Sequence, residues 1–179
     1  LGAIQSAGIV GMGGATFPAH IKLKPAKPVD ILILNGAECE PYLTADYRLM
    51  LEEADKIVTG TRILGKILGV KRSVIGIEDN KPEAIKVMQQ ACAGKDIEVA
   101  ALKTKYPQGA EKMLIKVIAD REVPMGGLPM DVGAVVQNVG TVAAITDAVV
   151  AGLPLTERIT TVSGDAIAQP KNLRVRIGT

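Results

Sequence analysis

The sequence is poor in aromatic residues, cysteine and net charge. Only 2% of its 179 residues are aromatic and none is tryptophan, so it lacks the stacking rings that hold single-stranded nucleic acids. A net charge of +2 gives no electrostatic attraction to nucleic acid either. Its two cysteines, Cys39 and Cys92, indicate a reducing compartment rather than a disulfide framework. They are also too few to hold an Fe–S cluster by themselves.

Long hydrophobic runs are missing as well. No apolar run approaches the roughly 18 residues of a transmembrane helix, and no segment has the pattern of a secretory signal peptide. Hydrophobic residues make up 47% of the chain and charged residues 22%, which is typical of a globular domain. The chain begins on Leu1 rather than on a methionine, and we expect it to be a piece of a longer protein.

What the sequence does have is a glycine-rich stretch near its start, residues 8–22, with glycines at 8, 11, 13 and 14. Because glycine lacks a Cβ and tolerates positive φ, such a run can expose backbone N–H groups as a cradle for an anion. Lys22 follows the glycines and could reach a phosphate as a point charge. The spacing matches neither the P-loop nor the dinucleotide-binding fingerprint, so a flexible entry loop remains an alternative.

The rest of the chain alternates between apolar runs and amphipathic segments. The runs are typical of buried parallel strands and cover residues 30–34, 71–77, 97–102 and 132–136. Helical spacing predicts helices over residues 46–68, about 82–92, 111–119 and about 141–151. Gly60 and Gly65 weaken the prediction that the first of these helices is continuous. The alternation predicts an α/β fold, with a mostly parallel Rossmann-like sheet and helices on both faces.

The final segment has a different pattern. Residues 158–163 and 173–177 alternate between apolar and polar side chains, which predicts a β-hairpin. A hairpin of this size cannot bury a core of its own, so it would be the start of a second, β-rich unit. We therefore divide the chain into an α/β domain, residues 1–153, and the truncated beginning of a second domain, residues 154–179.

Polar turns follow three of the predicted segments. Residues 35–41 read Asn-Gly-Ala-Glu-Cys-Glu-Pro, residues 105–111 read Lys-Tyr-Pro-Gln-Gly-Ala-Glu, and residues 137–141 read Gln-Asn-Val-Gly-Thr. In open α/β sheets, ligands bind outside the carboxyl ends of the strands. We therefore expect these turns and the glycine-rich stretch to converge on one site.

Taken together, these motifs resemble those of the FMN- and NADH-binding subunit of respiratory complex I, and within that family the C subunits of Rnf electron-transport complexes. Residues 76–82 and 160–164 are also similar to the Rnf proteins. The resemblance covers nearly the whole chain. It implies a site for FMN and NADH, and it implies that the hairpin begins a β-grasp (SLBB-type) domain.

The resemblance also implies roles for single residues. In the glycine-rich stretch, Gly11, Gly13 and Gly14 would lie against the flavin, Lys22 would bind its phosphate, and Phe17 would pack on the adenine of the dinucleotide. The turns would supply the remaining cofactor-binding residues. These are Asn35, Glu38, Glu40, Gly109, Glu111, Asn138 and Thr141.

Two positions depart from the family pattern. Ala37 stands where the complex I protein usually has an Asp, and Ala110 stands where it usually has a Glu, so both replacements remove an anion from the family's nucleotide-binding pattern. We expect no catalytic side chain and no metal ligand, since hydride transfer between NADH and flavin needs no general base. The lone His20 and the thiol of Cys39 therefore have no assigned role.

The resemblance further implies an NADH-oxidising flavin module of an ion-translocating complex, with NAD(H) and the other Rnf subunits as partners. The 4Fe-4S clusters would lie in a missing part of the full-length protein. Contact with the cytoplasmic side of the cell membrane would be peripheral, through partner subunits, and no nucleic acid would bind. The alternatives are a corrinoid reductase of bacterial microcompartments, which shares these motifs, and a flavin-free nucleotide-binding scaffold module.

Overall fold

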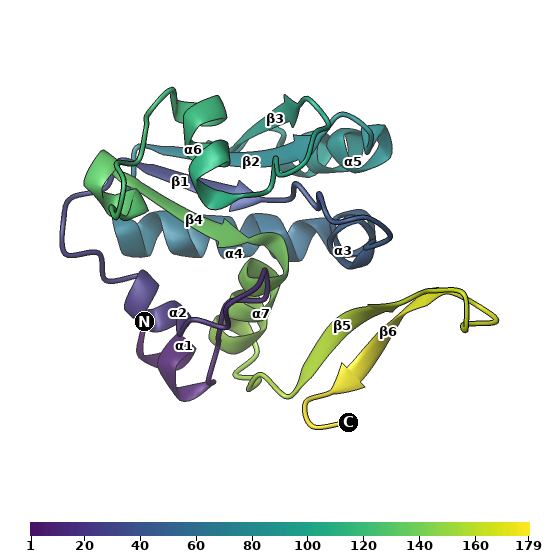
Figure 1. Ribbon diagram of the computed structural model, residues 1–179. Coiled ribbons are helices and arrows are strands. Elements are labelled where there is room, and N and C mark those ends of the chain that lie inside the picture. Colours follow the sequence, from purple (N-terminus) through teal and green to yellow (C-terminus); the bar gives the residue numbers. More distant parts are fainter.

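A computed structural model describes the whole chain, residues 1–179, and its centre is a parallel four-stranded sheet (Figure 1). The strands lie in the order β3-β2-β1-β4 and are all parallel. Their bounds are Ile31–Asn35 for β1, Arg72–Glu78 for β2, Glu98–Leu102 for β3 and Ala134–Asn138 for β4. The predicted α/β fold and its parallel sheet are confirmed.

Helices cover both faces of this sheet, as the sequence predicts. One face packs on α3 (Ala45–Glu52), α4 (Ala54–Leu68), α5 (Pro82–Cys92) and α7 (Val139–Val150) in the larger of two buried clusters. The other face packs on α6 (Glu111–Ala119) in the smaller cluster, which places α6 above the sheet in Figure 1. The short helices α1 (Gly2–Ser6) and α2 (Ala19–Lys22) adjoin each other, and α1 contacts α7.

The predicted helix over residues 46–68 is two helices. The break falls at Glu53, whose backbone leaves the helical region with φ −128° and ψ 31°. Helix α4 continues through Gly60. This glycine lies where α4 packs against α7. A Cβ at this position would lie 2.5 Å from the carbonyl oxygen of Val142, so only glycine permits the observed approach.

Strand β4 begins two residues later than predicted. Pro129–Val132 form a single 3-10 turn, η1, and Gly133 reverses the chain with a φ of 74° before β4 starts at Ala134. Val132 is therefore part of the turn, and the apolar run that predicted the strand includes it because the turn also packs on the smaller buried cluster.

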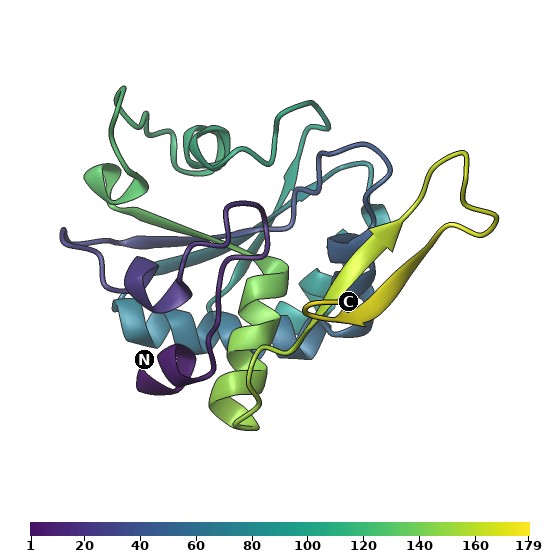
Figure 2. The same cartoon turned by 60° about the horizontal axis from the view of Figure 1, so that its bottom comes forward.

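The predicted hairpin is present as the antiparallel strands β5 (Glu157–Val162) and β6 (Lys171–Arg176). It projects from the sheet domain beyond α7 (Figure 2). Polar contacts join it to the segment before α3: the Thr44 N–H donates to Thr161 Oγ1 at 3.2 Å, and Asn172 Nδ2 donates to the Thr44 carbonyl at 3.1 Å. The division into domains at residues 153 and 154 stays a prediction.

The connectivity of the sheet creates one topological switch point. The chain passes from β1 outward through β2 to β3 and then returns to place β4 on the other side of β1. At the carboxyl end of this junction, Asn35 of β1 and Asn138 of β4 stand opposite each other. A switch point of this kind is where open α/β sheets bind their ligands.

Candidate functional site

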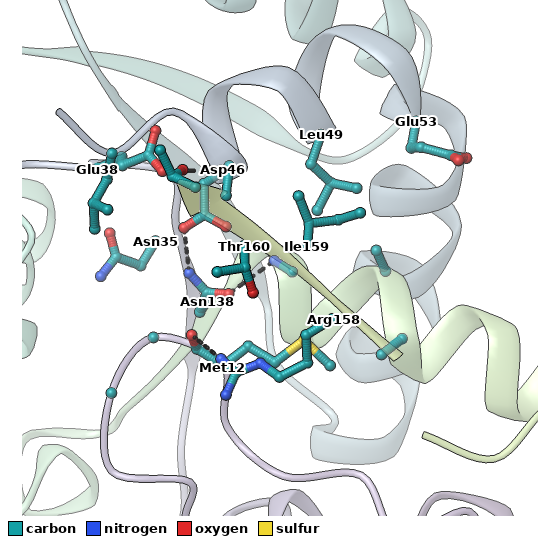
Figure 3. Close-up of a pocket in the computed structure, with 18 of the residues that line it drawn as sticks. Met12, Asn35, Glu38, Asp46, Leu49, Glu53, Asn138, Arg158, Ile159 and Thr160 are labelled. Atoms are coloured by element: carbon teal, nitrogen blue, oxygen red, sulfur yellow. Dashed lines mark hydrogen bonds between the residues drawn. The ribbon is translucent and has the colours of Figure 1, made fainter. Parts of the chain in front are cut away.

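A cleft of about 1100 Å³ opens at this end of the sheet. Its walls come from the glycine-rich stretch, the turns after β1 and β3, α3 and the start of α4, one side of α7, the segment 153–156 and the hairpin. The sequence-predicted convergence of loops is therefore what the structure shows. Figure 3 looks into this cleft, with Asn35, Asp46 and Asn138 close together.

Two backbone hydrogen bonds hold the glycine-rich stretch in place. The Gly11 N–H donates to the Phe17 carbonyl at 2.9 Å, which closes the loop on itself. The Met12 N–H donates to Thr141 Oγ1 at 2.9 Å, which fixes the loop to the first turn of α7. Both ribbon views accordingly show the loop beside the upper end of α7 (Figures 1 and 2).

Gly13 is the point of closest approach between this loop and the sheet. A Cβ on Gly13 would lie 3.1 Å from Asn138 Cβ, and the Gly13 N–H donates to no protein acceptor. The loop thus presents a free backbone donor at the cleft without a side chain in front of it. This is the exposed-amide arrangement that the glycine pattern predicts.

Asn138 joins three parts of the chain. Its Oδ1 accepts the N–H groups of Gly140 at 2.9 Å and Thr141 at 3.2 Å, which caps α7. Its Nδ2 donates to Asp46 Oδ2 at 2.6 Å, a contact visible as a dashed line in Figure 3. Asn138 therefore orients the start of α7 and the start of α3 at once.

The turn after β1 is ordered by its own polar side chains. Asn35 Nδ2 donates to the Gly109 carbonyl at 2.8 Å, and Asn35 Oδ1 accepts the Ala37 N–H at 3.1 Å. The Glu38 carboxylate accepts the backbone N–H groups of Asp46 at 3.0 Å and Tyr47 at 3.2 Å. Glu38 thus supplies the capping acceptor for α3, which no residue adjacent to the helix provides.

Gly109 brings the turn after β3 against the turn after β1. A Cβ at Gly109 would lie 2.3 Å from the Ala37 carbonyl oxygen and 3.1 Å from Cys39 Sγ. Beyond it, Glu40 accepts a hydrogen bond from the Tyr106 hydroxyl at 3.2 Å. The negative charge of Glu40 is the main reason that the pKa of Tyr106 is raised.

Asp46 has the most perturbed carboxyl group in the cleft. Burial, and then the negative charge of Glu38, raise its pKa from 3.8 to about 6, against the opposing effects of the Asn138 hydrogen bond and the Arg158 charge. No cation forms an ion pair with Asp46; its only side-chain partner is Asn138 Nδ2. A half-buried carboxyl with a raised pKa and no ion-pair partner within 4.0 Å is a feature that often marks functional sites.

Comparisons with known proteins decide the family. The model of the Nuo51 FMN-binding domain matches residues 4–147. The chain belongs to this family. It is also 66% identical to the C subunit of the proton-translocating ferredoxin:NAD(+) oxidoreductase complex of Clostridium ljungdahlii, covering all of this chain and 40% of that protein. The C subunit of the Na(+)-translocating complex of Acetobacterium woodii is 53% identical over 98% of this chain and 40% of its own length.

A third relative and a solved structure agree with this assignment. The C subunit of an ion-translocating oxidoreductase complex of Vibrio cholerae is 49% identical over 98% of this chain and 23% of its own length. A crystal structure of an NAD+-reducing [NiFe]-hydrogenase in its H2-reduced state has the same fold, with a TM-score of 0.81 at 24% identity, over 99% of this chain and 36% of that one. The resemblance to Rnf C subunits is therefore confirmed, and the chain spans less than half the length of these relatives. None of its helices is both long and apolar enough to cross a bilayer.

Within this Nuo51-family fold, the predicted cofactor-binding residues fall into two groups. The first group lines the cleft and consists of Gly13, Gly14, Asn35, Glu38, Glu40, Gly109 and Asn138. The second group lies outside the lining and consists of Gly11, Phe17, Lys22, Glu111 and Thr141. Of this second group, Lys22 and Glu111 form an ion pair with 2.5 Å between Nζ and Oε1, and Thr141 is fully buried beneath the glycine loop. Their roles stay predictions.

The sequence interpretation missed two residues of the cleft. Asp46 reads as an ordinary acidic residue in the first turn of a helix, and only its burial beside Glu38 separates it from such residues. Arg158 lies on β5, where alternation predicts a strand and nothing predicts contact with the glycine loop. Its Nη2 nevertheless donates to the Met12 carbonyl at 2.9 Å, across 146 positions of sequence.

The two positions that depart from the family pattern both line the cleft. Ala37 is buried, and its carbonyl packs against Gly109. Ala110 precedes α6 in the N-cap position, where its methyl group offers no acceptor. The described residues contain no group of three or more His, Cys, Asp or Glu side chains placed to hold a metal ion.

Proposed function

We propose that this chain is the FMN- and NADH-binding module of an Rnf-type electron-transport complex. NADH oxidation would occur here, and electrons would leave to Fe–S centres in parts of the protein outside this chain. The module would act at the cytoplasmic face of the cell membrane through the other subunits of the complex. The sequence relatives named above are all C subunits of ion-translocating oxidoreductases, which favours this proposal over a corrinoid reductase.

The observation that carries the proposal is the packing of Gly13 on Asn138 at the switch point of the sheet. This packing puts a bare backbone segment, a free N–H and the two strand-end asparagines at one edge of the cleft. A flat heterocycle and a phosphate need such a combination, because a ring requires close backbone approach and a phosphate requires unpaired donors.

Two buried polar atoms without partners belong to residues that adjoin the cleft in the chain but do not line it. Gln137 Nε2 and Gln108 Oε1 are buried and have no hydrogen-bond partner. Gln137 directly precedes Asn138 at the end of β4, and Gln108 directly precedes Gly109. A buried unpaired donor or acceptor costs free energy, about 1–3 kcal/mol each, and a bound water, ion or ligand is one way to offset that cost.

FMN, when bound, accepts a hydride as an electron pair and passes electrons on singly. The residues of this chain would hold and orient it. Asn35 and Asn138 would keep their amide groups fixed, because each is already hydrogen-bonded to two backbone groups of the protein. Glu38 would hold the start of α3 in position beneath the cleft. These bonds exist within the protein itself, so the site would be largely preformed.

The test is a titration of the purified chain with FMN under anaerobic conditions, followed by addition of NADH or NADPH. We expect quenching of flavin fluorescence on binding, and bleaching of the bound flavin by NADH faster than by NADPH. A chain that leaves FMN fluorescence unchanged would instead favour the flavin-free scaffold alternative.

A pair of variants locates the binding. Gly13→Val adds bulk against Asn138 and should abolish quenching while helix content by circular dichroism stays unchanged. Ala26→Val adds bulk at an exposed position of the segment before β1 and should bind FMN like the unchanged chain. Normal FMN binding by Gly13→Val would show that the loop is only a linker.

A further inference from the structure

The cleft is unusually short of free positive charge. Six carboxylates line it, against three cationic side chains, Lys56, Arg158 and Arg174. A phosphate monoester carries nearly two negative charges at neutral pH. A bound nucleotide therefore needs a cation close to its phosphate to offset the surrounding carboxylates.

Two of the three cations already have carboxylate partners. Lys56 Nζ lies 3.3 Å from Glu53 Oε2 and 3.1 Å from Asp147 Oδ1. Arg174 Nη1 lies 3.8 Å from Glu157 Oε2 on the neighbouring strand. The Lys22 ammonium, outside the lining, is paired with Glu111.

Arg158 differs from these cations. Its guanidinium makes a single hydrogen bond, from Nη2 to the carbonyl of Met12, and no carboxylate lies within the 4.0 Å of an ion pair. The side chain is half-buried in the wall of the cleft, and Figure 3 shows it beside Met12. Most of its N–H donors are thus unpaired, in a place where solvent screens charge only partly.

The surroundings of Arg158 match those of a phosphate. Met12, which it contacts, precedes Gly13 with its free N–H, and the Met12 N–H is held by Thr141 in the first turn of α7. A helix N-terminus adds partial positive charge at this point. The single bond to Met12 fixes the position of the guanidinium beside the loop and leaves the rest of its donor fork available.

From this geometry we propose that Arg158, on the hairpin, binds a phosphate group of the nucleotide in the cleft. The inference rests on the proposed function and adds to it that the hairpin supplies part of the cofactor site. The phosphate belongs either to FMN or to the dinucleotide. The two phosphates would bind a guanidinium in the same way, and the experiment below distinguishes between them.

The experiment uses the full-length protein and the variants Arg158→Gln and Arg158→Lys, with Arg176→Gln as the matched control. Arg176 is an exposed arginine at the end of β6, outside the lining of the cleft, and its replacement makes the same change in charge. Dissociation constants are measured for FMN, for riboflavin, which lacks the phosphate, and for ADP-ribose, which carries the pyrophosphate of the dinucleotide.

We expect Arg158→Gln to weaken binding of one phosphate-bearing ligand about 10- to 100-fold, the loss that follows removal of a charged hydrogen bond. Riboflavin should bind within about twofold of its wild-type affinity, and Arg158→Lys should recover part of the loss because it restores the charge. A loss confined to FMN assigns its phosphate to Arg158, and a loss confined to ADP-ribose assigns the pyrophosphate.

Two results would overturn the inference. Equal losses for FMN and riboflavin would show that Arg158 acts only by holding the glycine loop through Met12. Unchanged binding of all three ligands would show that it contacts no phosphate. Failure of the wild-type protein to bind FMN would be a different outcome, because it would overturn the proposed function together with this inference.

Discussion

Replacing Asp46 by Asn should stabilise the protein, and the gain should depend on pH. In the folded chain the Asp46 pKa is raised to about 6 from 3.8, so the folded state binds this proton more tightly than the unfolded state. Unfolding therefore releases a proton between about pH 4 and pH 6, and the free energy of unfolding falls as pH rises through this range. Above about pH 6 the charged carboxylate is a constant cost to the folded state.

The size of this cost follows from the two pKa values. The difference between 3.8 and about 6 corresponds to about 3 kcal/mol. Asp46 is only half-buried, so solvent screens part of this effect, and we expect about 1–3 kcal/mol. Asn has nearly the same shape, carries no charge and keeps an oxygen that can accept from Asn138.

The assay is urea unfolding of wild type and Asp46→Asn at several values between pH 4 and pH 8. The difference in unfolding free energy should be near zero at pH 4, grow up to about pH 6 and stay constant above it. The matched control is Asp55→Asn, which removes an exposed carboxylate in the first turn of α4 and should not stabilise the protein. A stability difference for Asp46→Asn that is the same at every pH, or destabilisation above pH 6, would refute the reasoning.

Three further substitutions test the packing and the site. Gly60→Ala should destabilise the chain by about 1–3 kcal/mol in urea unfolding, because the added Cβ would lie 2.5 Å from the Val142 carbonyl oxygen. Gly109→Ala should weaken FMN binding at least tenfold by fluorescence titration, because its Cβ would displace the Ala37 carbonyl, 2.3 Å away. The sequence assigns the FMN phosphate to Lys22, which would have to exchange Glu111 for the phosphate; on that assignment Lys22→Ala should weaken FMN binding about tenfold and riboflavin binding much less.

The chain supplies controls for these substitutions. Gly65→Ala lies in the same helix as Gly60, and its nearest neighbour would be Ser73 Oγ at 3.5 Å, so it should be neutral or stabilising. Lys24→Ala removes an exposed charge close to Lys22 and should leave both flavins bound normally. Equal destabilisation by the two glycine variants, or equal effects of Lys22→Ala on FMN and riboflavin, would contradict these predictions.

The sequence predicts the sheet well because local signals and burial agree there. Strands β1, β2 and β4 are short apolar runs buried on both faces, so the fold class follows directly from their alternation with helices. The bounds are less predictable. The prediction that a strand begins at Val132 is wrong, because the 3-10 turn before β4 also contains apolar residues. The helix break at Glu53 could not be predicted, because no Gly or Pro occurs there.

The cleft is predictable only in part. The turns containing Asn35, Gly109 and Asn138 could be placed at one sheet edge, since parallel strands share a direction. What could not be predicted is how side chains from distant segments pair once they meet. The bond from Asn138 to Asp46 and the bond from Arg158 to Met12 depend on three-dimensional packing that no local pattern encodes.

The contacts of the glycine loop also bear on the order in which the protein matures on the ribosome. The loop is among the first segments of this chain to be synthesised, but its partners Thr141 and Arg158 lie 129 and 146 positions after Met12. At a typical elongation rate of about 5–20 residues per second, these partners follow the loop by roughly 6–30 s. During that interval the nascent loop has neither of its anchors. On the proposed function, we expect cofactor loading to follow the release of almost the whole of this segment from the ribosomal tunnel.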